Sequence, residues 1–581
     1  MKQALFAISS ALILAACSGA PEPPPAGEGV TLYPAAQIIT MDAMQAEANM
    51  VAVADGRILA VGDAEELSEA YPAAMRDETF TDKTLVPGLI DPHIHMALSS
   101  LQYATKLTPP WEMATPDGVV DGLPDRAAFL AAVRTLVADH EGDGPLIIFG
   151  YHNLVHGDLV RADLDAVTTE VPLIIWHYSS HDFYLNENAI DWAGVTAELH
   201  EQFEGIDLGP HGQPTGRVYE DAIPYLLQKM GPVLLHPDRI ARGLSGFSSL
   251  LRLGGVTTVA DLGYGIFGRA LEDANIANNW VSPENAGYRL YLVPEHRAFS
   301  AEFGVGAPDA VAQMVRGDIE TVAPVLPQVK FFADAAFYSQ TMRLSPPGYL
   351  AGQSKGTEGL WVIKPNEMAE TIMPYWEAGF DVRIHSNGDA AQTASLDALE
   401  ALRQSETEGS QTQRFVFEHA GLFSPEQVAR AGKLGAGISA ASHYVYFLGE
   451  AYQEPLGSER GDWILPLGAL TEAGVPVTLH SDAPLAPPLP LRAASVHMTR
   501  ATREGGVLNP EQALSAYEAL EAVTIDAAYA LGLEDEIGAI KPGLLADFTV
   551  LDASPLETPG ADWGEIGIWG VVLGGEKQPL E

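Results

Sequence analysis

Eight short apolar runs, separated by stretches of helical character, dominate the central part of this 581-residue chain. The first run lies inside LVPGLIDPHIHM (85–96). The other seven are GVTTVADLG (255–263), YRLYLV (288–293), VKFFAD (329–334), FDVRIHS (380–386), RFVFEHA (414–420), GAGISAASH (435–443) and VPVTLHSD (475–482). Strands and helices that alternate in this number predict an α/β fold of the (β/α)8 barrel type. The carboxyl ends of the strands of such a barrel open on one face, where active sites lie.

The two ends of the chain share a different character, with short apolar segments and turn signals. A hairpin signal at Asp55-Gly56 separates two apolar segments, and GAIKPGLLADFTVL (538–551) has a similar composition near the C-terminus. We therefore predict a small β-sandwich domain built from residues 30–84 and 538–581. The barrel is expected over residues 85–537, with a long insertion at about 97–242 after its first strand.

The N-terminus has the pattern of a secretory signal. Lys2 precedes an apolar run of about signal-peptide length that is too short to span a membrane, and the run ends in Leu-Ala-Ala-Cys (14–17). This ending resembles the signal of bacterial lipoproteins, in which the cysteine is lipidated. We predict a signal peptide at 1–16, lipidation of Cys17, which is the sole cysteine, and a Pro-rich tether at 17–29. The protein is then expected in the bacterial cell envelope, held on the outer membrane facing the periplasm, with the lipid on Cys17 as its only membrane contact.

The charge of the chain restricts its partners. With 77 acidic and 32 Lys or Arg residues the formal charge is −45, which repels the phosphates of nucleic acid and favours solubility. The acidity itself says little about the substrate, since an acidic surface can simply be inert. We expect a small-molecule substrate and no nucleic-acid partner. The sequence leaves the oligomeric state open, with a homodimer as one option.

Ionisable residues end or interrupt the predicted strands in an unusual number. His93 and His95 follow the first strand, and i and i+2 side chains of a strand point the same way. The other members are Lys330, His385, His419, His443 and Asp482. Each alone has an ordinary explanation, such as a hydrogen-bonded polar group or a lysine that reaches solvent. Together they are expected to converge on one face of the barrel.

The set resembles the amidohydrolase superfamily, and more narrowly its YtcJ-like (amidohydrolase 3) family. The segments that carry the resemblance follow in order along nearly the whole chain after the tether. They are LVPGLIDPHIHM, SSHDFYLNENAI, QPTGRVYED, GGVTTVAD, VKFFADAAF, VRIHSNGDAA, FVFEHAG, LHSDAPLAPPLP and GAIKPGLLADFTVLD.

The resemblance implies a site with two divalent metal ions, usually zinc. His93, His95 and Asp482 would hold the first ion, and His385 and His419 the second. Lys330 would bridge both ions after carboxylation by carbon dioxide. Because an ammonium in an apolar strand is costly, conversion to an anion between two cations is physically reasonable. Imidazole and carboxylate together suit zinc, with iron and manganese as alternatives.

The implied reaction is hydrolysis of a non-peptide, amide-like carbon–nitrogen bond by a metal-activated water. Asp482 would move the proton from the water to the departing nitrogen, and His443 would stabilise the oxyanion or orient the substrate. His181 and Glu220 in the insertion, and His480 just before the ligand Asp482, are candidates to line the substrate pocket. Ala335 and the segment HSNGDAA depart from the usual family pattern without removing a proposed ligand.

Two other functions remain open from the sequence. A deaminase or cyclic-amide hydrolase could use the same barrel, although many deaminases use one metal and lack the bridging lysine. A non-catalytic periplasmic binding lipoprotein is the third reading, which the intact ligand set disfavours. The identity of the substrate does not follow from the sequence.

Overall fold

The structure is a computed structural model that describes residues 27–279, 286–406 and 413–580. The predicted signal peptide, Cys17 and most of the tether lie outside the described residues and stay predictions. Within the described ranges, no helix combines the length and apolarity needed to cross a bilayer.

Eight parallel strands form the barrel, and they coincide with the eight apolar runs. Two sheets, β6–β15–β16 and β17 to β21, are joined by bridges from Glu295 to Lys330 and from Ile94 to Ala483. The strands are β6 (Leu89–Ile94), β15 (Val256–Tyr264), β16 (Arg289–Pro294), β17 (Gln328–Phe332), β18 (Asp381–Ser386), β19 (Phe415–His419), β20 (Gly437–Ala441) and β21 (Val477–His480). Most of their residues are buried, as expected for parallel strands that are covered on both faces. The predicted barrel is confirmed.

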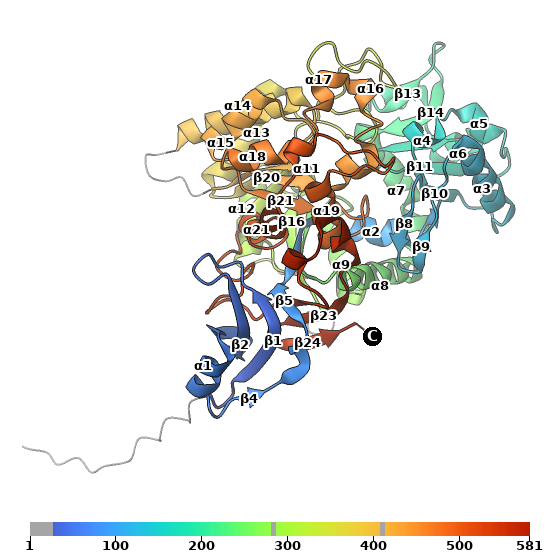
Figure 1. Ribbon diagram of the computed structural model, residues 1–581. Helices are drawn as coiled ribbons and strands as arrows, with labels where there is room; N and C mark the ends of the chain where they lie inside the picture. Colours follow the sequence, from blue (N-terminus) through green and yellow to red (C-terminus); the bar gives the residue numbers. More distant parts are fainter. Residues whose placement is uncertain (1–26, 280–285, 407–412, 581) are drawn as a thin grey trace, which may run out of the picture.

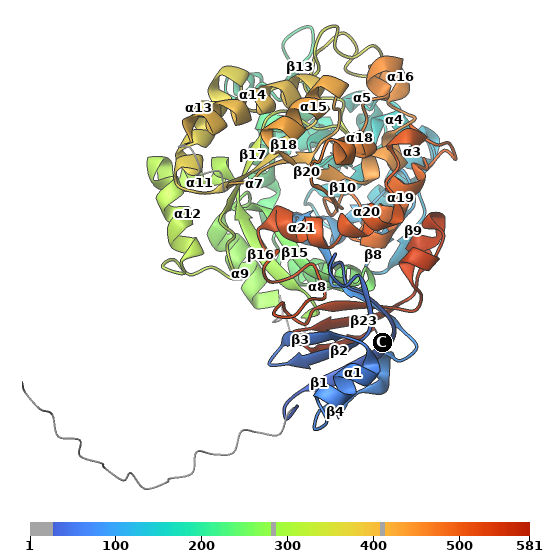
Figure 2. The ribbon, with the colours of Figure 1, turned by 60° about the vertical axis from the view of Figure 1, so that its left-hand side comes forward.

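Helices cover the outside of the barrel between successive strands (Figures 1 and 2). They include α8 (Pro237–Leu253), α9 (Arg269–Asn279), α11 (His296–Phe303), α12 (Ala307–Val315), α13 (Pro365–Glu377), α14 (Asp389–Ser405), α15 (Pro425–Leu434), α18 (Leu467–Glu472) and α21 (Ile525–Leu531). Local sequence sets their ends. Helix α15 begins at a capping box formed by Ser424 and Gln427, and it ends at Gly435, whose φ of 66° suits a glycine.

Both chain ends meet in one mixed sheet beside the barrel (Figure 1). Its order is β24–β23–β22–β5–β1–β2–β3, with the short β4 (Met75–Arg76) paired to β1. The N-terminal strands are β1 (Thr31–Ile39), β2 (Glu47–Ala54), β3 (Arg57–Gly62) and β5 (Thr84–Pro87), and the C-terminal strands are β22 (Phe548–Leu551), β23 (Ile568–Leu573) and β24 (Glu576–Pro579). The joint contribution of both ends is confirmed. The sandwich arrangement and the exact domain limits stay predictions.

The segment between β6 and β15 carries a sheet of its own, at one side of the barrel (Figure 1). Its order is β13–β14–β12–β11–β10–β7. The strands are β7 (Lys106–Leu107), β10 (Leu146–Tyr151), β11 (Leu173–His177), β12 (Asp182–Leu185), β13 (Ile206–Leu208) and β14 (Pro214–Tyr219). The same segment also contains helix α3 (Arg126–Ala138). This sheet brings β12 and β14 to the mouth of the barrel.

Candidate metal centre and substrate cavity

His93, His95 and Asp482 converge at the carboxyl end of the barrel. His93 is the penultimate residue of the buried strand β6, His95 precedes helix α2 (Met96–Tyr103), and Asp482 follows β21. Asp482 Oδ1 lies 3.2 Å from His95 Nε2 and 3.5 Å from His93 Nε2. The three residues form a group whose donor atoms could hold one metal ion. The register of parallel strands brings them together although almost 400 positions separate them in sequence.

A buried carboxylate orients the first of these histidines. Glu418 Oε2 lies 2.7 Å from His93 Nδ1, and its other oxygen accepts a hydrogen bond from Arg383 Nε. All three side chains are fully buried. Because Nδ1 faces a carboxylate, Nε2 is the nitrogen left to face Asp482, which is the arrangement that metal-binding histidines commonly show.

Lys330 is fully buried in β17, beneath the same group. Its Nζ lies 3.4 Å from His93 Nε2 and 5.2 Å from the centre of the Phe332 ring. Burial, which is the largest effect, lowers the pKa of the Lys330 ammonium to about 8. The neutral amine is therefore accessible near neutral pH, and that is the form that can react with carbon dioxide.

His385 and His419 stand next to each other on neighbouring strands, with ring centres 4.5 Å apart. His385 Nε2 lies 3.2 Å from the carbonyl oxygen of Ala335 and 3.0 Å from Asn387 Nδ2. His419 Nδ1 lies 3.5 Å from Asp482 Oδ2. Burial lowers the pKa of both imidazoles well below the ordinary value, so both are neutral, the form that binds metals.

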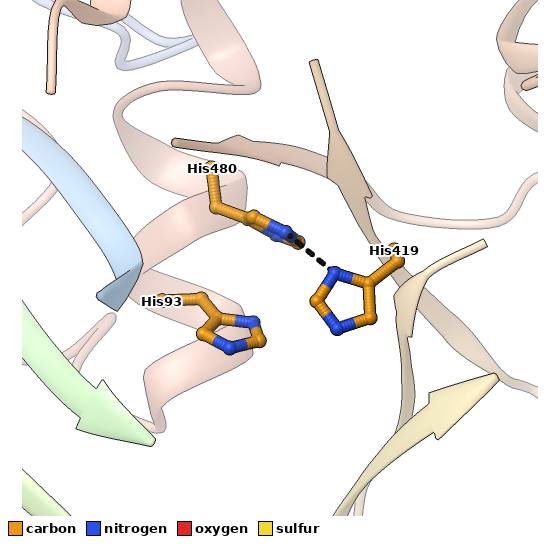
Figure 3. A group of neighbouring side chains, drawn as sticks. All are labelled: His93, His419 and His480. Carbon is orange, nitrogen blue, oxygen red and sulfur yellow. Dashed lines mark hydrogen bonds between the residues drawn. The ribbon is translucent and has the colours of Figure 1, made fainter. Parts of the chain in front are cut away.

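His480 occupies a different place from the one expected of a pocket-lining residue. It is 1% exposed. Its Nε2 lies 3.2 Å from His419 Nδ1, and its Nδ1 lies 2.7 Å from Ser439 Oγ. Figure 3 shows its ring directed at His419, above His93. His480 is the last residue of β21, and Asp482 follows beyond the strand end with a φ of 53°. Both side chains lie near His419 Nδ1. His93, His419 and His480 accordingly form a second group with metal-binding geometry.

His443 follows β20 and is 3% exposed. Neither of its ring nitrogens has a hydrogen-bond partner among the described residues. Burial lowers the pKa of His443 to about 4, so the ring is neutral. It stacks on Tyr338, whose ring centre is 5.4 Å away.

A cavity opens in front of the proposed ligands. Its lining includes His95, Lys330, His385, His419 and Asp482 from the barrel. The remaining wall is mainly apolar or aromatic, with Leu98, Phe332, Ala336, Phe337, Tyr338, Tyr444 and Leu485, and the insertion adds Ser179, Ser180 and His181. His480 and His443 are not part of this lining.

Glu220 stands behind His181 at the cavity mouth. Its Oε2 lies 3.0 Å from His181 Nδ1, and its Oε1 accepts a hydrogen bond of 2.9 Å from Thr341 Oγ1. The two insertion residues that the sequence singled out are therefore direct neighbours, and His181 is the one that reaches the cavity.

The donor atoms at the centre fit a divalent cation. Asp482 Oδ1 is buried and has no hydrogen-bond partner among the described residues, although two imidazole nitrogens face it. A buried carboxylate oxygen without a partner is costly, and a cation between it and the imidazoles would remove that cost. Nitrogen and carboxylate donors in this number are those that zinc prefers.

Sequence reasoning missed two carboxylates that support the ligands. Glu418 is not apparent as a supporting residue from the sequence because it adjoins His419, and neighbours in a strand normally point to opposite faces. Here His419 has a φ of 69°, which breaks the alternation at the strand end. Asp261 accepts hydrogen bonds from the backbone N–H groups of Met96 and Gly263 and lies 3.9 Å from His95 Nδ1. A lone acidic residue inside an apolar run was the available signal in both cases.

Comparison with known proteins identifies the family. The sequence model of the amidohydrolase family (Amidohydro_3) matches residues 81–577. A second model, described as an imidazolonepropionase-like composite domain of bacteria, matches only residues 51–74.

Individual relatives are distant but match along most of their length. An N-substituted formamide deformylase of Arthrobacter pascens is 25% identical over 91% of this chain and 95% of its own. The Bacillus subtilis (strain 168) protein YtcJ is 23% identical over 90% of this chain and 95% of its own. A crystal structure of an uncharacterized metal-dependent hydrolase from Pyrococcus horikoshii OT3 superposes with a TM-score of 0.66 at 18% identity, covering 91% of this chain and 99% of that one. At this identity the last match supports the fold alone.

Proposed function

This chain belongs to the amidohydrolase family, and from that membership we propose that it hydrolyses non-peptide, amide-like carbon–nitrogen bonds with a metal-activated water. The observation that carries the proposal is the group of His93, His95 and Asp482, whose donor atoms lie close enough together to hold one metal ion beside a largely apolar cavity. The deformylase relative acts on N-substituted formamides, and N-formyl and N-acyl amides are therefore the first substrates to test.

We propose two divalent ions, zinc by the nature of the donors. His93, His95 and Asp482 would hold one ion, His385 and His419 the other, and Lys330 would lie between them as a carbamate. The carbamate forms when the neutral Nζ attacks carbon dioxide and loses a proton. Ions bound there would lower the pKa of a shared water and polarise the substrate carbonyl.

The protein's own groups would handle the proton and the orientation. Asp482 takes the proton of the attacking water and passes it to the nitrogen that leaves, which is general acid–base catalysis. Glu418 keeps the tautomer of His93 fixed through Nδ1. The apolar wall at Phe337 and Leu485 excludes bulk water from the reacting bond. We propose that His443 stabilises the oxyanion or orients the substrate, because it stacks on the cavity residue Tyr338 and its ring nitrogens have no partner among the described residues.

A substrate panel with metal analysis tests this function. The purified protein should contain close to two transition-metal ions per chain, hydrolyse members of an amide, N-formyl, N-acyl and lactam panel, lose turnover with a chelator and regain it with zinc. If the protein hydrolyses only the lactams of the panel, it is a cyclic-amide hydrolase. If it releases ammonia from amino-substituted rings, it is a deaminase. No turnover of any member by the metal-loaded protein would contradict the proposal and favour a binding protein.

We also propose that residues 1–16 are a signal peptide and that Cys17 is lipidated, with 17–29 as the tether to the outer membrane. The support is the sequence pattern alone. Cys17→Ser should leave the protein unprocessed or release it from membrane fractions. A variant that fractionates and is processed as the wild type would show that Cys17 is no lipid anchor.

A further inference from the structure

The pair of His181 and Glu220 is built by the insertion and not by the barrel. Asp182 in β12 pairs in register with Tyr219 in β14, so His181 and Glu220 sit one residue beyond the same end of the two strands. The N–H of Glu220 also donates to the carbonyl oxygen of His181. The pair is thus fixed by strand register.

A buried ion pair locks the two strands at this point. Arg217 donates from Nε and Nη2 to the two oxygens of Asp182, at 2.8 and 2.7 Å, and the Asp182 side chain is fully buried. A bidentate arrangement of this kind fixes geometry as well as charge. It holds the strand ends from which His181 and Glu220 project.

The backbone at the pair adopts conformations that non-glycine residues rarely take. Ser180 has a φ of 64° and Glu220 a φ of 45°. Such positions cost free energy and persist where the surrounding structure imposes them, often at ligand sites. Ser180 directly precedes His181 and lines the cavity with it, and Glu220 is the other member of the pair.

The ring of His181 leaves one nitrogen for another molecule. Nδ1 faces Glu220, and no described residue forms a hydrogen bond to Nε2. The side chain is 28% exposed, whereas that of Glu220 is 11% exposed, so the imidazole is the accessible partner. Its ring centre lies 6.2 Å from that of His385, so His181 and a proposed metal ligand border the same cavity.

We propose that His181 binds the substrate through Nε2 and that Glu220 positions the His181 imidazole. The cavity then accepts a neutral amide with an apolar substituent. His181 meets the polar end of the molecule across the cavity from Asp482, and Phe332, Phe337 and Leu485 receive the substituent. This rests on the proposed function for the reaction, and it adds the substrate class and the role of the insertion. Glu220 acts only through His181.

The test uses the full-length, metal-loaded protein and one probe, N-(2-phenylethyl)formamide. The readout is KM and kcat if the probe is hydrolysed, and the Kd from calorimetry if it is not. His181→Ala should raise KM or Kd about tenfold or more, because the hydrogen bond between His181 Nε2 and the polar end of the probe is lost. The matched control is His211→Ala, an exposed histidine in the same insertion, which should leave both values unchanged.

A double variant separates positioning from a structural role. Glu220→Gln should raise KM or Kd by several-fold with kcat within about twofold, and metal content should stay at the wild-type level. His181→Ala combined with Glu220→Gln should be no worse than His181→Ala alone, because Glu220 has no effect once His181 is gone. Additive losses would show that Glu220 acts independently and would overturn its assigned role.

The remaining outcomes distinguish this inference from the proposed function. Unchanged KM or Kd in His181→Ala overturns the pair's role while hydrolysis stands. A wild type that hydrolyses other amides but neither hydrolyses nor binds the probe overturns the substrate class alone. Binding of the probe that depends on His181, without hydrolysis of any amide, keeps the inference and overturns the proposed reaction.

Discussion

The two sides of the cavity are built in different ways. On the barrel side, His93, Glu418 and Arg383 are fully buried and linked by hydrogen bonds across three strands. On the insertion side, His181 is partly exposed and depends on one carboxylate and on strained backbone from a separate sheet. We infer that the two sides have different roles. The barrel side holds the proposed metal ligands and so determines the reaction, whereas the insertion side determines which substrate binds.

The largest effect should come from the proposed bridge on the barrel side. Lys330→Ala is expected to remove at least one metal ion and lower turnover about 100-fold or more, since it would remove a proposed direct ligand and not merely a supporting group. Metal analysis and turnover of the same preparation measure it. Acetate or bicarbonate should partly restore activity, and Lys330→Arg should not substitute, because guanidinium stays positive. Lys433→Ala, at an exposed lysine, is the control. Near-wild-type metal content in Lys330→Ala would rule out the bridge.

Removing the charge behind His93 should have the next largest effect. Glu418→Gln is expected to weaken metal binding about 10- to 100-fold, the usual result of losing a carboxylate that orients a ligand histidine. A metal titration of folded protein measures this. Ser439→Ala is the comparison, because Ser439 bonds to His480, which is outside the proposed ligand set. Equal weakening in both variants would indicate that His93, His419 and His480 form the working site instead.

A substitution on the insertion side should weaken substrate binding and leave the metal content unchanged. Arg217→Met leaves Asp182 buried without its partner, and the free energy of unfolding is expected to fall by about 3 kcal/mol. KM for an accepted amide should rise because the strand ends beneath His181 loosen, while metal content stays. Arg57→Met provides the control, since Arg57 and Glu536 are 45% and 46% exposed and such pairs contribute about 0–1 kcal/mol. A loss of metal in Arg217→Met would show that the two sides are not separable.

The smallest effect concerns a carboxyl group behind the barrel ligands. Burial first, and the charge of Asp261 second, raise the pKa of Glu272 to about 8. A carboxyl whose pKa is raised on folding keeps a proton that the unfolded chain has released. Its contribution to stability is therefore present below its ordinary pKa and is lost as the pH rises through about 8. Glu272→Gln should flatten the fall in stability between about pH 5 and about pH 8, measured by denaturation at each pH. An unchanged slope would mean that another group titrates.

The barrel could be predicted from the sequence because its strands are buried on both faces and read as short apolar runs. The positions of His385, His419 and Asp482 at strand ends followed from the same pattern, and the structure brings them together. The role of His480 did not follow. Whether a strand-end side chain lies on the cavity wall or one layer below depends on where each strand stops, which the apolar pattern locates only to within a few residues.

The sequence by itself determined the alternation of strands and helices, the polar residues that end the strands, and the sharing of one small sheet by both chain ends. Each of these depends on local burial and residue type, which the order of amino acids carries directly. Only the tertiary structure decided that Glu418 supports His93, that His480 packs on His419, and that Glu220 holds His181 at the cavity. These contacts join segments 325, 61 and 39 positions apart. They arise from strand register and from backbone at positive φ, and no local pattern encodes either.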